Sequence, residues 1–156
     1  MELYLLRHGA AARSSPGQPD AHRALTPEGA RAVRDILTRA ANMGMRPEAI
    51  LSSPYLRAME TAEIAAQVLG YAEPILQSRA LEPDAAPPEL WAQIRVHGSA
   101  SVLVVSHEPL LSSAVAWVQG ITKSLSPFPP GGLARVDIER VGAVPIGKVH
   151  WLPGAE

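Results

Sequence analysis

The chain has 156 residues, of which 47% are hydrophobic, and its formal net charge at pH 7 is -1. This length and composition predict one globular domain, residues 1–156, with a hydrophobic core of its own. The small net charge gives no reason to expect binding to nucleic acid or to an anionic membrane. Because the sequence contains no cysteine, it excludes disulfide bonds, thiol catalysis and thiolate metal ligands.

No leader or membrane segment is expected. The first apolar run begins at Leu3, which leaves no room for a removable signal sequence before it. No apolar stretch of the sequence approaches the roughly 20 residues that a membrane helix needs. We therefore expect a cytoplasmic protein that does not bind membranes.

Strand and helix signals alternate along the chain, beginning with a strand. The apolar run Leu3–Leu6 predicts that strand, and the polar residues 10–24 predict a long loop after it. A helix is then expected, with Thr26 as its N-terminal cap and Pro27 in its first turn. The apolar side chains of this helix recur at helical spacing and predict one buried stripe. The stripe consists of Val33, Ile36, Leu37, Ala40 and Ala41.

A second strand signal, the run Ala49–Leu51, precedes a second helix signal. We expect this helix to begin at Pro54, with Ser53 as its cap, and to end before Gly70. A short strand is expected at residues 74–76. The order strand, helix, strand favours a parallel sheet with crossover helices.

The rest of the chain predicts two more helices and three more strands. The expected elements are a helix at Pro88–His97, a strand at Ser101–Val105, a helix from just after His107 to Gly120, a loop at 126–132, and two edge strands at 133–138 and 146–151 joined around Gly142. The whole pattern predicts an α/β fold, a three-layer α/β/α sandwich. Its central sheet is expected to be mostly parallel with an antiparallel edge.

A basic side chain follows each of three expected core strands. Arg7 and His8 end the first strand, Arg57 lies one turn beyond the second, and His107 follows the third. The carboxyl ends of parallel strands share one sheet edge, where ligands of open α/β sheets bind. Arginine offers a charged fork suited to phosphate, and neutral imidazole is a nucleophile near pH 7. The sequence therefore favours a phosphate held by Arg7 and attacked by His8.

These motifs resemble those of the histidine phosphatase superfamily. The similar segments are Leu-Arg-His-Gly at 6–9, Ser-Ser-Pro-x-x-Arg-Ala-x-x-Thr-Ala at 52–62 and Val-Ser-His-Glu-Pro at 105–109. The short chain, the His-Glu-Pro form and the segment from Asp20 to Gly29 are most similar to the compact phosphohistidine phosphatase branch. The resemblance is ordered and spans nearly the whole chain.

The resemblance implies that Arg7, His8, Arg57 and His107 are the catalytic residues. It implies that His8 attacks phosphorus in line and forms a phosphohistidine that water then hydrolyses. Arg7, Arg57 and His107 would bind the phosphoryl oxygens. No cofactor and no metal are expected, because two flanking arginines would repel a cation.

Further substrate contacts are expected from Gly9, His22 and Glu108. Glu108 can alternatively orient the histidine before it or cap the helix after it, where a carboxylate is favoured by the helix dipole. Glu82 and Asp84 lie where larger relatives carry a general acid, but the pattern in this loop matches poorly. The sequence thus leaves the existence of a general acid open among these three carboxylates.

The function that the sequence favours is a metal-independent phosphatase acting on phosphohistidine in a protein. An imidazole leaves more readily than an alkoxide, so such a substrate needs less help from an acid. One alternative is a phosphatase for small or varied phosphomonoesters. Another is a non-catalytic phosphoprotein-binding module, which is disfavoured because a decayed enzyme would have lost His8. The expected partner is a phosphorylated protein or a small phosphorylated substrate.

Overall fold

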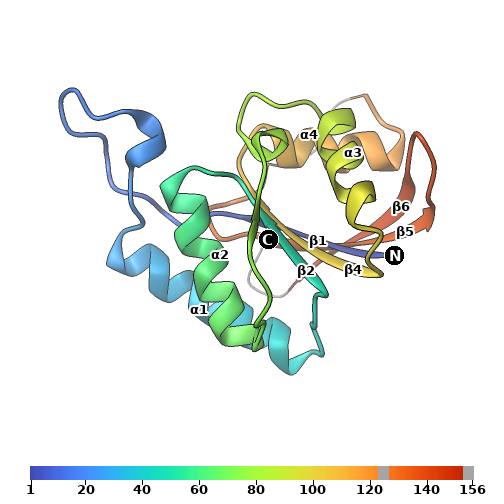
Figure 1. Ribbon diagram of the computed structural model, residues 1–156, viewed down its shortest axis with the longest axis horizontal. Helices are drawn as coiled ribbons and strands as arrows, with labels where there is room; N and C mark the ends of the chain where they lie inside the picture. The colour runs from blue at the N-terminus through green and yellow to red at the C-terminus, as the bar shows by residue number, and fades with distance from the viewer. Residues whose placement is uncertain (123–126, 153–156) are drawn as a thin grey trace.

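The computed structural model describes residues 1–122 and 127–152, and its strands form one sheet with the order β3-β2-β4-β1-β5-β6 (Figure 1). The strands are β1 (Glu2–Arg7), β2 (Ala49–Ser52), β3 (Leu76–Gln77), β4 (Ser101–Ser106), β5 (Leu133–Arg140) and β6 (Ile146–Trp151). The helices are α1 (Pro27–Asn42), α2 (Leu56–Leu69), α3 (Pro87–His97) and α4 (Leu110–Gln119), with short 3₁₀ turns η1 (Asp20–His22) and η2 (Arg79–Leu81).

The direction of the strands confirms the expected mixed sheet. β1, β2, β3 and β4 run parallel, whereas β5 and β6 form an antiparallel edge beside β1. The register places Arg7 opposite Ser106 and Ser52 opposite Val105. The three central strands therefore end level, and the segments that follow them begin side by side.

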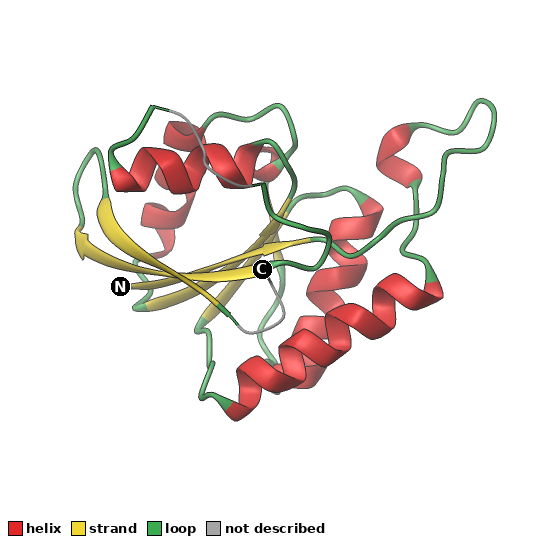
Figure 2. Cartoon of the chain, turned by 180° about the vertical axis from the view of Figure 1, so that it is seen from behind, coloured by secondary structure: helices red, strands yellow, loops and turns green. Residues whose placement is uncertain are grey.

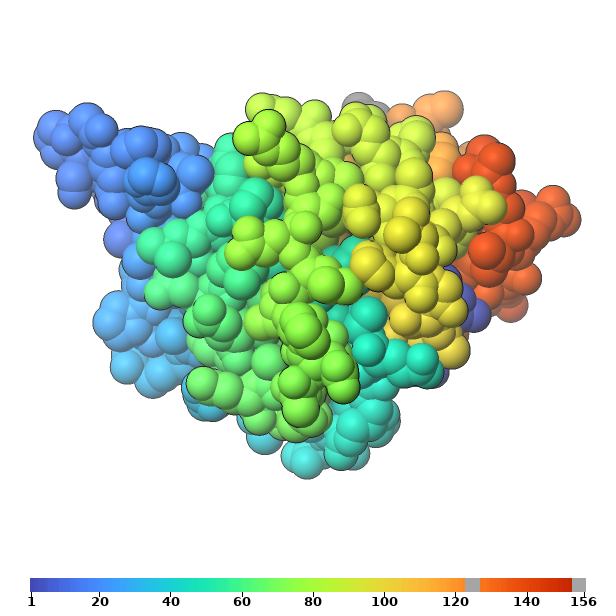
Figure 3. Space-filling model, in the orientation of Figure 1, coloured from blue at the N-terminus to red at the C-terminus, as the bar shows by residue number. Residues whose placement is uncertain are grey.

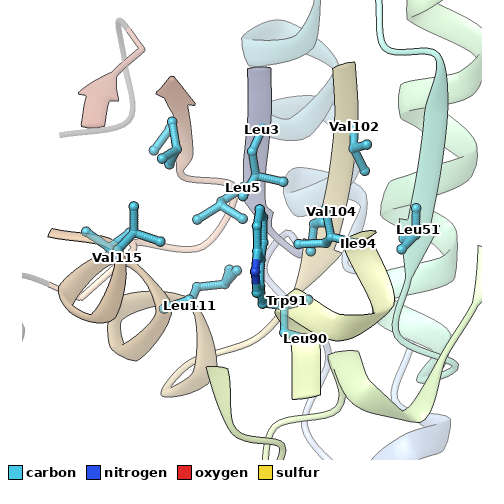
Figure 4. Packing of buried hydrophobic residues seen from close by; sticks show 14 of the residues in the cluster. Leu3, Leu5, Leu51, Leu90, Trp91, Ile94, Val102, Val104, Leu111 and Val115 are labelled. Atoms are coloured by element: carbon cyan, nitrogen blue, oxygen red, sulfur yellow. The ribbon is translucent and has the colours of Figure 1, made fainter. Parts of the chain in front are cut away.

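Helices cover both faces of the sheet, which confirms the three-layer arrangement (Figure 2). Apolar side chains of α1 and α2 share one core with Leu6 and Ile50, and those of α3 and α4 share the other with Leu5 and Val104. In the second core, Trp91 and Leu111 point at the strands from their helices (Figure 4). β1, β2 and β4 are buried on both faces because of this packing, which explains their continuous apolar runs.

The expected helix starts are confirmed in one case and wrong in another. Thr26 caps α1, since its hydroxyl accepts a hydrogen bond from the Gly29 N–H at 2.9 Å. The second helix does not begin at Pro54 with Ser53 as its cap. It begins at Leu56, two residues later, and the side chain of Ser53 turns toward the sheet edge instead.

Smaller differences concern the remaining elements. The third helix begins at Pro87, and the short strand lies at Leu76–Gln77 rather than at 74–76. In the expected loop 126–132, Ser126 lies outside the described residues. Within residues 1–122 and 127–152 no helix combines the length and apolar character needed to cross a bilayer.

Residues 10–24 project from the body of the protein beside the carboxyl ends of the strands (Figures 1 and 3). We call this segment the arm. A backbone bridge between Ala11 and Leu25 closes its base, and the Glu60 carboxylate accepts a hydrogen bond from the Leu25 N–H at 2.8 Å. The arm is thus fixed at its base on α2, while η1 within it lies near the end of the sheet.

Candidate active site

The level strand ends bring the expected basic side chains together. The ring centroids of His8 and His107 lie 5.0 Å apart, and Arg57 Nε lies 3.2 Å from His8 Nε2. Arg7 precedes His8 in the chain and contributes to the electrostatic field at both histidines. We call Arg7, His8, Arg57 and His107 the basic cluster.

The His8 ring is fixed in one orientation and one tautomer. It is buried, and its Nδ1 donates a hydrogen bond to the Gly9 carbonyl at 2.7 Å. The other ring nitrogen, Nε2, then carries a lone pair and accepts from Arg57 Nε. Burial, together with the nearby arginines, lowers the pKa of His8 to about 4 despite the bond to Gly9. At neutral pH His8 is therefore an uncharged imidazole whose Nε2 carries no proton.

Gly9 holds this arrangement with its backbone. Its N–H donates to Thr61 Oγ1 at 3.2 Å, while its carbonyl accepts from His8. A Cβ atom at this position would come within 2.8 Å of Val33 and 2.9 Å of the Gly29 carbonyl. Both polar groups of Gly9 thus have partners within the protein, and the expected substrate contact from this residue has no free backbone donor.

Arg57 reaches into the site from the first turn of α2 and uses its whole guanidinium. Its Nε donates to His8, its Nη1 to the Asp20 carbonyl at 2.9 Å, and its Nη2 to Asp20 Oδ2 at 3.1 Å. The Tyr55 ring lies beneath it, 5.0 Å from Cζ. The sequence does not predict Asp20 as a site residue, although Asp20 begins the segment, up to Gly29, that resembles the family.

His107 is almost completely buried, and a serine holds its ring. Ser53 Oγ lies 2.7 Å from His107 Nε2 and also accepts a hydrogen bond from the Tyr55 N–H. The Ser53 hydroxyl can then donate to Nε2, which puts the ring proton on Nδ1. Burial, followed by the nearby His8 and Arg57, lowers the pKa of His107 to about 3. The His107 ring is therefore neutral. Its Nε2 accepts a hydrogen bond from Ser53, and its Nδ1–H is a hydrogen-bond donor.

Arg7 points from the end of β1 toward the loop before β5. Its Nη1 donates to the Phe128 carbonyl at 2.7 Å, and the Gly131 N–H donates to the His8 carbonyl at 3.0 Å. Burial lowers the pKa of the Arg7 guanidinium, and the nearby Glu108 opposes this effect. The loop 127–132 thus closes one side of the site.

Two buried donors of the basic cluster lack a partner among the described residues. They are Arg7 Nε and His107 Nδ1. An unpaired buried donor is costly, and a cluster of donors beside arginines suits the oxygens of an anion. Arg57 Nε, by contrast, already donates to His8 Nε2, so these two atoms are the donors of the basic cluster that a bound anion would find unpaired.

The other expected site residues lie around the cluster in different roles. Glu108 caps α4, since its carboxylate accepts from the Ser112 N–H at 3.0 Å and from the Ser112 hydroxyl. His22 is exposed in the arm, and the contact with Arg57 comes from Asp20 two residues earlier. Asp84 is exposed and Glu82 is half-buried just after η2.

The η2 segment is tied to the sheet edge. The Ser106 hydroxyl donates to the Leu81 carbonyl at 2.7 Å, immediately before His107. Glu82 follows the hydrogen-bonded Leu81 directly in the chain, while Asp84 lies further along the loop. Among the described residues, no group of three His, Cys, Asp or Glu side chains is placed to hold a metal ion.

Comparison with known proteins gives the same family as the motifs. Residues 3–85 match the family model of the histidine phosphatase superfamily, branch 1. An uncharacterized protein of Picosynechococcus sp. is 34% identical over 123 residues, which are 78% of this chain and 73% of that protein.

Solved structures match over nearly the whole chain. The protein histidine phosphatase SixA, in complex with tungstate, is 28% identical with a TM-score of 0.86, covering 97% of this chain and 95% of its own. A candidate phosphohistidine phosphatase SixA from Agrobacterium tumefaciens is 28% identical with a TM-score of 0.79, covering 88% and 91%. A candidate α-ribazole-5′-P phosphatase from Escherichia coli, 18% identical with a TM-score of 0.72 over 97% and 95%, shares the fold.

Proposed function

The chain belongs to the histidine phosphatase superfamily and is a phosphatase, and on this basis we propose that it removes phosphoryl groups from phosphohistidine through a covalent intermediate on His8. The observation that carries the proposal is the His8 ring itself. Its Nδ1 proton is held by the Gly9 carbonyl, so the lone pair of Nε2 is directed into the basic cluster. A neutral, oriented imidazole is the form that attacks phosphorus.

In the proposed reaction, Nε2 of His8 forms a bond to phosphorus while the bond to the leaving group breaks. The bonding electron pair departs with the leaving atom. As the phosphoryl group binds, the Arg57 Nε–H passes from His8 Nε2 to a phosphoryl oxygen, which frees the Nε2 lone pair for attack. Arg7 Nε and His107 Nδ1 donate to the other phosphoryl oxygens, where charge is spread in the transition state. Water then attacks the phosphohistidine, the pair returns to Nε2, and phosphate is released. His8 keeps its Nδ1 proton on the Gly9 carbonyl throughout.

No metal takes part in this proposal. Arg7 and Arg57 supply fixed positive charge within the cluster, which is the electrostatic role that a metal ion has in other phosphatases. Activity should therefore be retained in the presence of a strong chelator. Loss of activity with the chelator, restored by adding a divalent metal, would contradict this part of the proposal.

Phosphohistidine is the proposed substrate because the site offers little acid assistance. Glu108 is occupied as the cap of α4, which removes the carboxylate nearest to His107 in the sequence. The relation to SixA supports the same substrate class, since SixA is a protein histidine phosphatase and covers 97% of this chain. A phosphorylated protein is then the expected partner, and the cytoplasm the expected location.

A small-molecule phosphomonoesterase is the second candidate, and the position of Glu82 favours it. The Ser106–Leu81 hydrogen bond anchors the backbone beside this carboxylate to the end of β4. A carboxyl group close to the site could protonate an alkoxide leaving group. The fold is shared with a candidate α-ribazole-5′-P phosphatase, so it accommodates such substrates in principle.

One assay separates these candidates. We would measure kcat/KM for a phosphohistidine peptide, an aryl phosphate and a panel of alkyl phosphates with the same preparation. We expect the phosphohistidine peptide and the aryl phosphate to be cleaved and the alkyl phosphates to be cleaved poorly. Efficient alkyl-ester hydrolysis without phosphohistidine hydrolysis would move the function to the second candidate.

A further inference from the structure

Asp20 connects the protein surface to the proposed nucleophile. Its side chain is 58% exposed, whereas the Arg57 side chain that it contacts is 5% exposed. Arg57 in turn donates to His8, which is buried. The order from solvent inward is therefore Asp20, Arg57 and His8, with the carboxylate as the outermost member.

The Asp20 carboxylate is held in place by two arginines. Arg23 Nε donates to Oδ1 at 2.7 Å, and Arg57 Nη2 donates to Oδ2 at 3.1 Å. Partial burial opposes ionisation, but the hydrogen bonds from Arg23 and Arg57 keep the pKa of Asp20 below its ordinary value. Asp20 is therefore an anion at neutral pH and has no proton to give to a leaving group.

This anion still has the capacity to accept a hydrogen bond. An ionised carboxylate offers about four lone-pair sites, and the two arginines use one on each oxygen. The remaining sites belong to a half-exposed group at the rim of a buried site. They are available to a donor that arrives with the substrate.

The direction of attack decides which part of the substrate lies near the rim. His8 approaches phosphorus from the buried floor of the site, and in-line displacement puts the leaving group on the opposite, solvent side. Asp20, the most exposed of the three connected residues, lies on the solvent side of Arg57. A leaving group therefore departs past a fixed negative charge.

We propose that Asp20 is a specificity-determining residue that selects a protonated phosphoimidazole, which releases a neutral imidazole, over a substrate whose leaving group departs as an anion. This inference rests on the proposed function and deepens it. In protonated phosphohistidine, one ring nitrogen is bonded to phosphorus and the other carries a proton. The Asp20 carboxylate accepts a hydrogen bond from that N–H, as the Gly9 carbonyl does from the Nδ1–H of His8.

The proposed step balances without an acid from the protein. The His8 Nε2–P bond forms, the substrate P–N bond breaks, and the electron pair returns to the substrate nitrogen. The imidazole leaves neutral, with its distal proton still on the ring and still held by Asp20. An aryl phosphate instead releases a phenolate, whose developing negative charge Asp20 repels.

The test compares Asp20→Asn with wild type on a phosphohistidine peptide and on para-nitrophenyl phosphate. The amide keeps the size of the side chain and an oxygen for Arg57 but removes the charge. We expect kcat/KM for the peptide to fall on the order of tenfold, the size of one hydrogen bond to a charged group. The value for the aryl phosphate should rise a few-fold, so the ratio of the two changes by more than either alone.

Glu28→Gln is the matched control. Glu28 forms an exposed ion pair with Arg31, three residues on, as Asp20 does with Arg23, but on the surface of α1. This variant should leave both substrates unchanged. It corrects for the general effect of removing one negative charge from the protein.

Three results would overturn the inference, and each has a different meaning. Equal losses on both substrates in Asp20→Asn would show that Asp20 only positions Arg57. Unchanged kcat/KM values for both substrates would show that Asp20 does not contact the leaving group. Wild-type protein that cleaves the aryl phosphate but not the peptide would overturn the proposed function itself, before any variant is compared.

Discussion

The basic cluster and the arm lie next to each other but are built in opposite ways. The cluster sits at the ends of buried parallel strands, and its histidines and Arg57 are buried. Most of the arm is exposed, and it contacts the site through one aspartate. Buried hydrogen bonds fix the cluster, whereas the arm depends on its closed base and on the Asp20–Arg57 pair.

This difference separates two tasks. Groups that stabilise the phosphoryl transition state gain from burial, because a low dielectric strengthens their interaction with developing charge. Groups that meet the rest of the substrate must remain accessible. We therefore expect substitutions in the cluster to reduce the turnover of every substrate, and substitutions at the rim to change the choice between substrates.

The largest expected effect is the loss of the proposed nucleophile, His8. His8→Ala should lower kcat by roughly 10⁴–10⁶-fold on any substrate, as the loss of a covalent nucleophile does in other enzymes. Single-turnover experiments with ³²P-labelled substrate should show labelled wild-type protein and unlabelled variant. Near-normal turnover in His8→Ala would place the chemistry outside the cluster and remove the distinction drawn above.

The second largest effect is expected from the loss of the Arg57 guanidinium. Arg57→Ala should lower kcat/KM by about 10²–10³-fold, the range for one preorganised donor to a charged transition state. Arg57→Lys keeps the positive charge but replaces the separate Nε and Nη2 donors of arginine with one ammonium group. This variant should therefore recover only part of the lost kcat/KM. Full recovery with lysine, measured on the same aryl phosphate, would mean that charge alone matters at this position.

Ser53 tests whether the cluster extends beyond its charged members. Ser53→Ala leaves the buried Nε2 of His107 without its partner and should lower kcat/KM about tenfold or more. Ser52→Ala is the matched control, because Ser52 is equally buried but donates to the Ser53 carbonyl instead of the ring. Both variants should lose stability in urea denaturation, and only Ser53→Ala should lose activity to this extent.

The sequence predicts the cluster well because strand ends in a parallel sheet share an edge. Arg7 and His8 follow one apolar run, His107 lies one residue beyond another, and one helical turn places Arg57 beside them. The mostly parallel sheet and the two helical layers follow from the alternation of strands and helices, whereas the order of the strands was not predicted. These features depend on local pattern, which a single sequence contains.

The roles of Ser53 and Asp20 depend on contacts between distant segments. Ser53 was expected as a helix cap because serine before proline is a common start, but its hydroxyl serves His107, 54 residues away in the chain. Asp20 reaches Arg57 across 37 residues because the arm folds back on α2. Glu108, which had several possible roles in the sequence, is committed to its own helix by a contact only four residues away.

Burial of the two histidines predicts how stability depends on pH. Burial lowers the pKa of His8 to about 4 and that of His107 to about 3, while an unfolded histidine titrates near 6.5. Below pH 6.5 the unfolded chain therefore binds protons that the folded protein refuses, so stability falls as the pH drops toward 4. The contribution is fully present above pH 6.5.

Urea denaturation at pH 7 and pH 5 measures this effect. Wild type should lose on the order of 4 kcal/mol more than the double variant His8→Asn, His107→Asn, because each of the two histidines contributes about 2 kcal/mol over this range. An equal loss in the two proteins would mean that the imidazoles are protonated in the folded state at pH 5. His8 would then not be held as a neutral nucleophile at that pH, and the cluster would be more accessible to water than its burial indicates.

The smallest effect is expected from the carboxylates around the cluster. Glu82→Gln, Asp84→Asn and Glu108→Gln should each change kcat/KM for an aryl phosphate and for a phosphohistidine peptide by less than about threefold, because neither leaving group needs a full proton transfer. For alkyl phosphates the rate should be low in wild type and should fall little further.

Glu82 is the most informative position, since the Ser106–Leu81 bond anchors the backbone beside it to the sheet. A large loss in Glu82→Gln confined to alkyl phosphates would identify it as a general acid. The rim would then carry a proton donor as well as the fixed anion of Asp20, and the small-molecule phosphomonoesterase would become the better description of the protein.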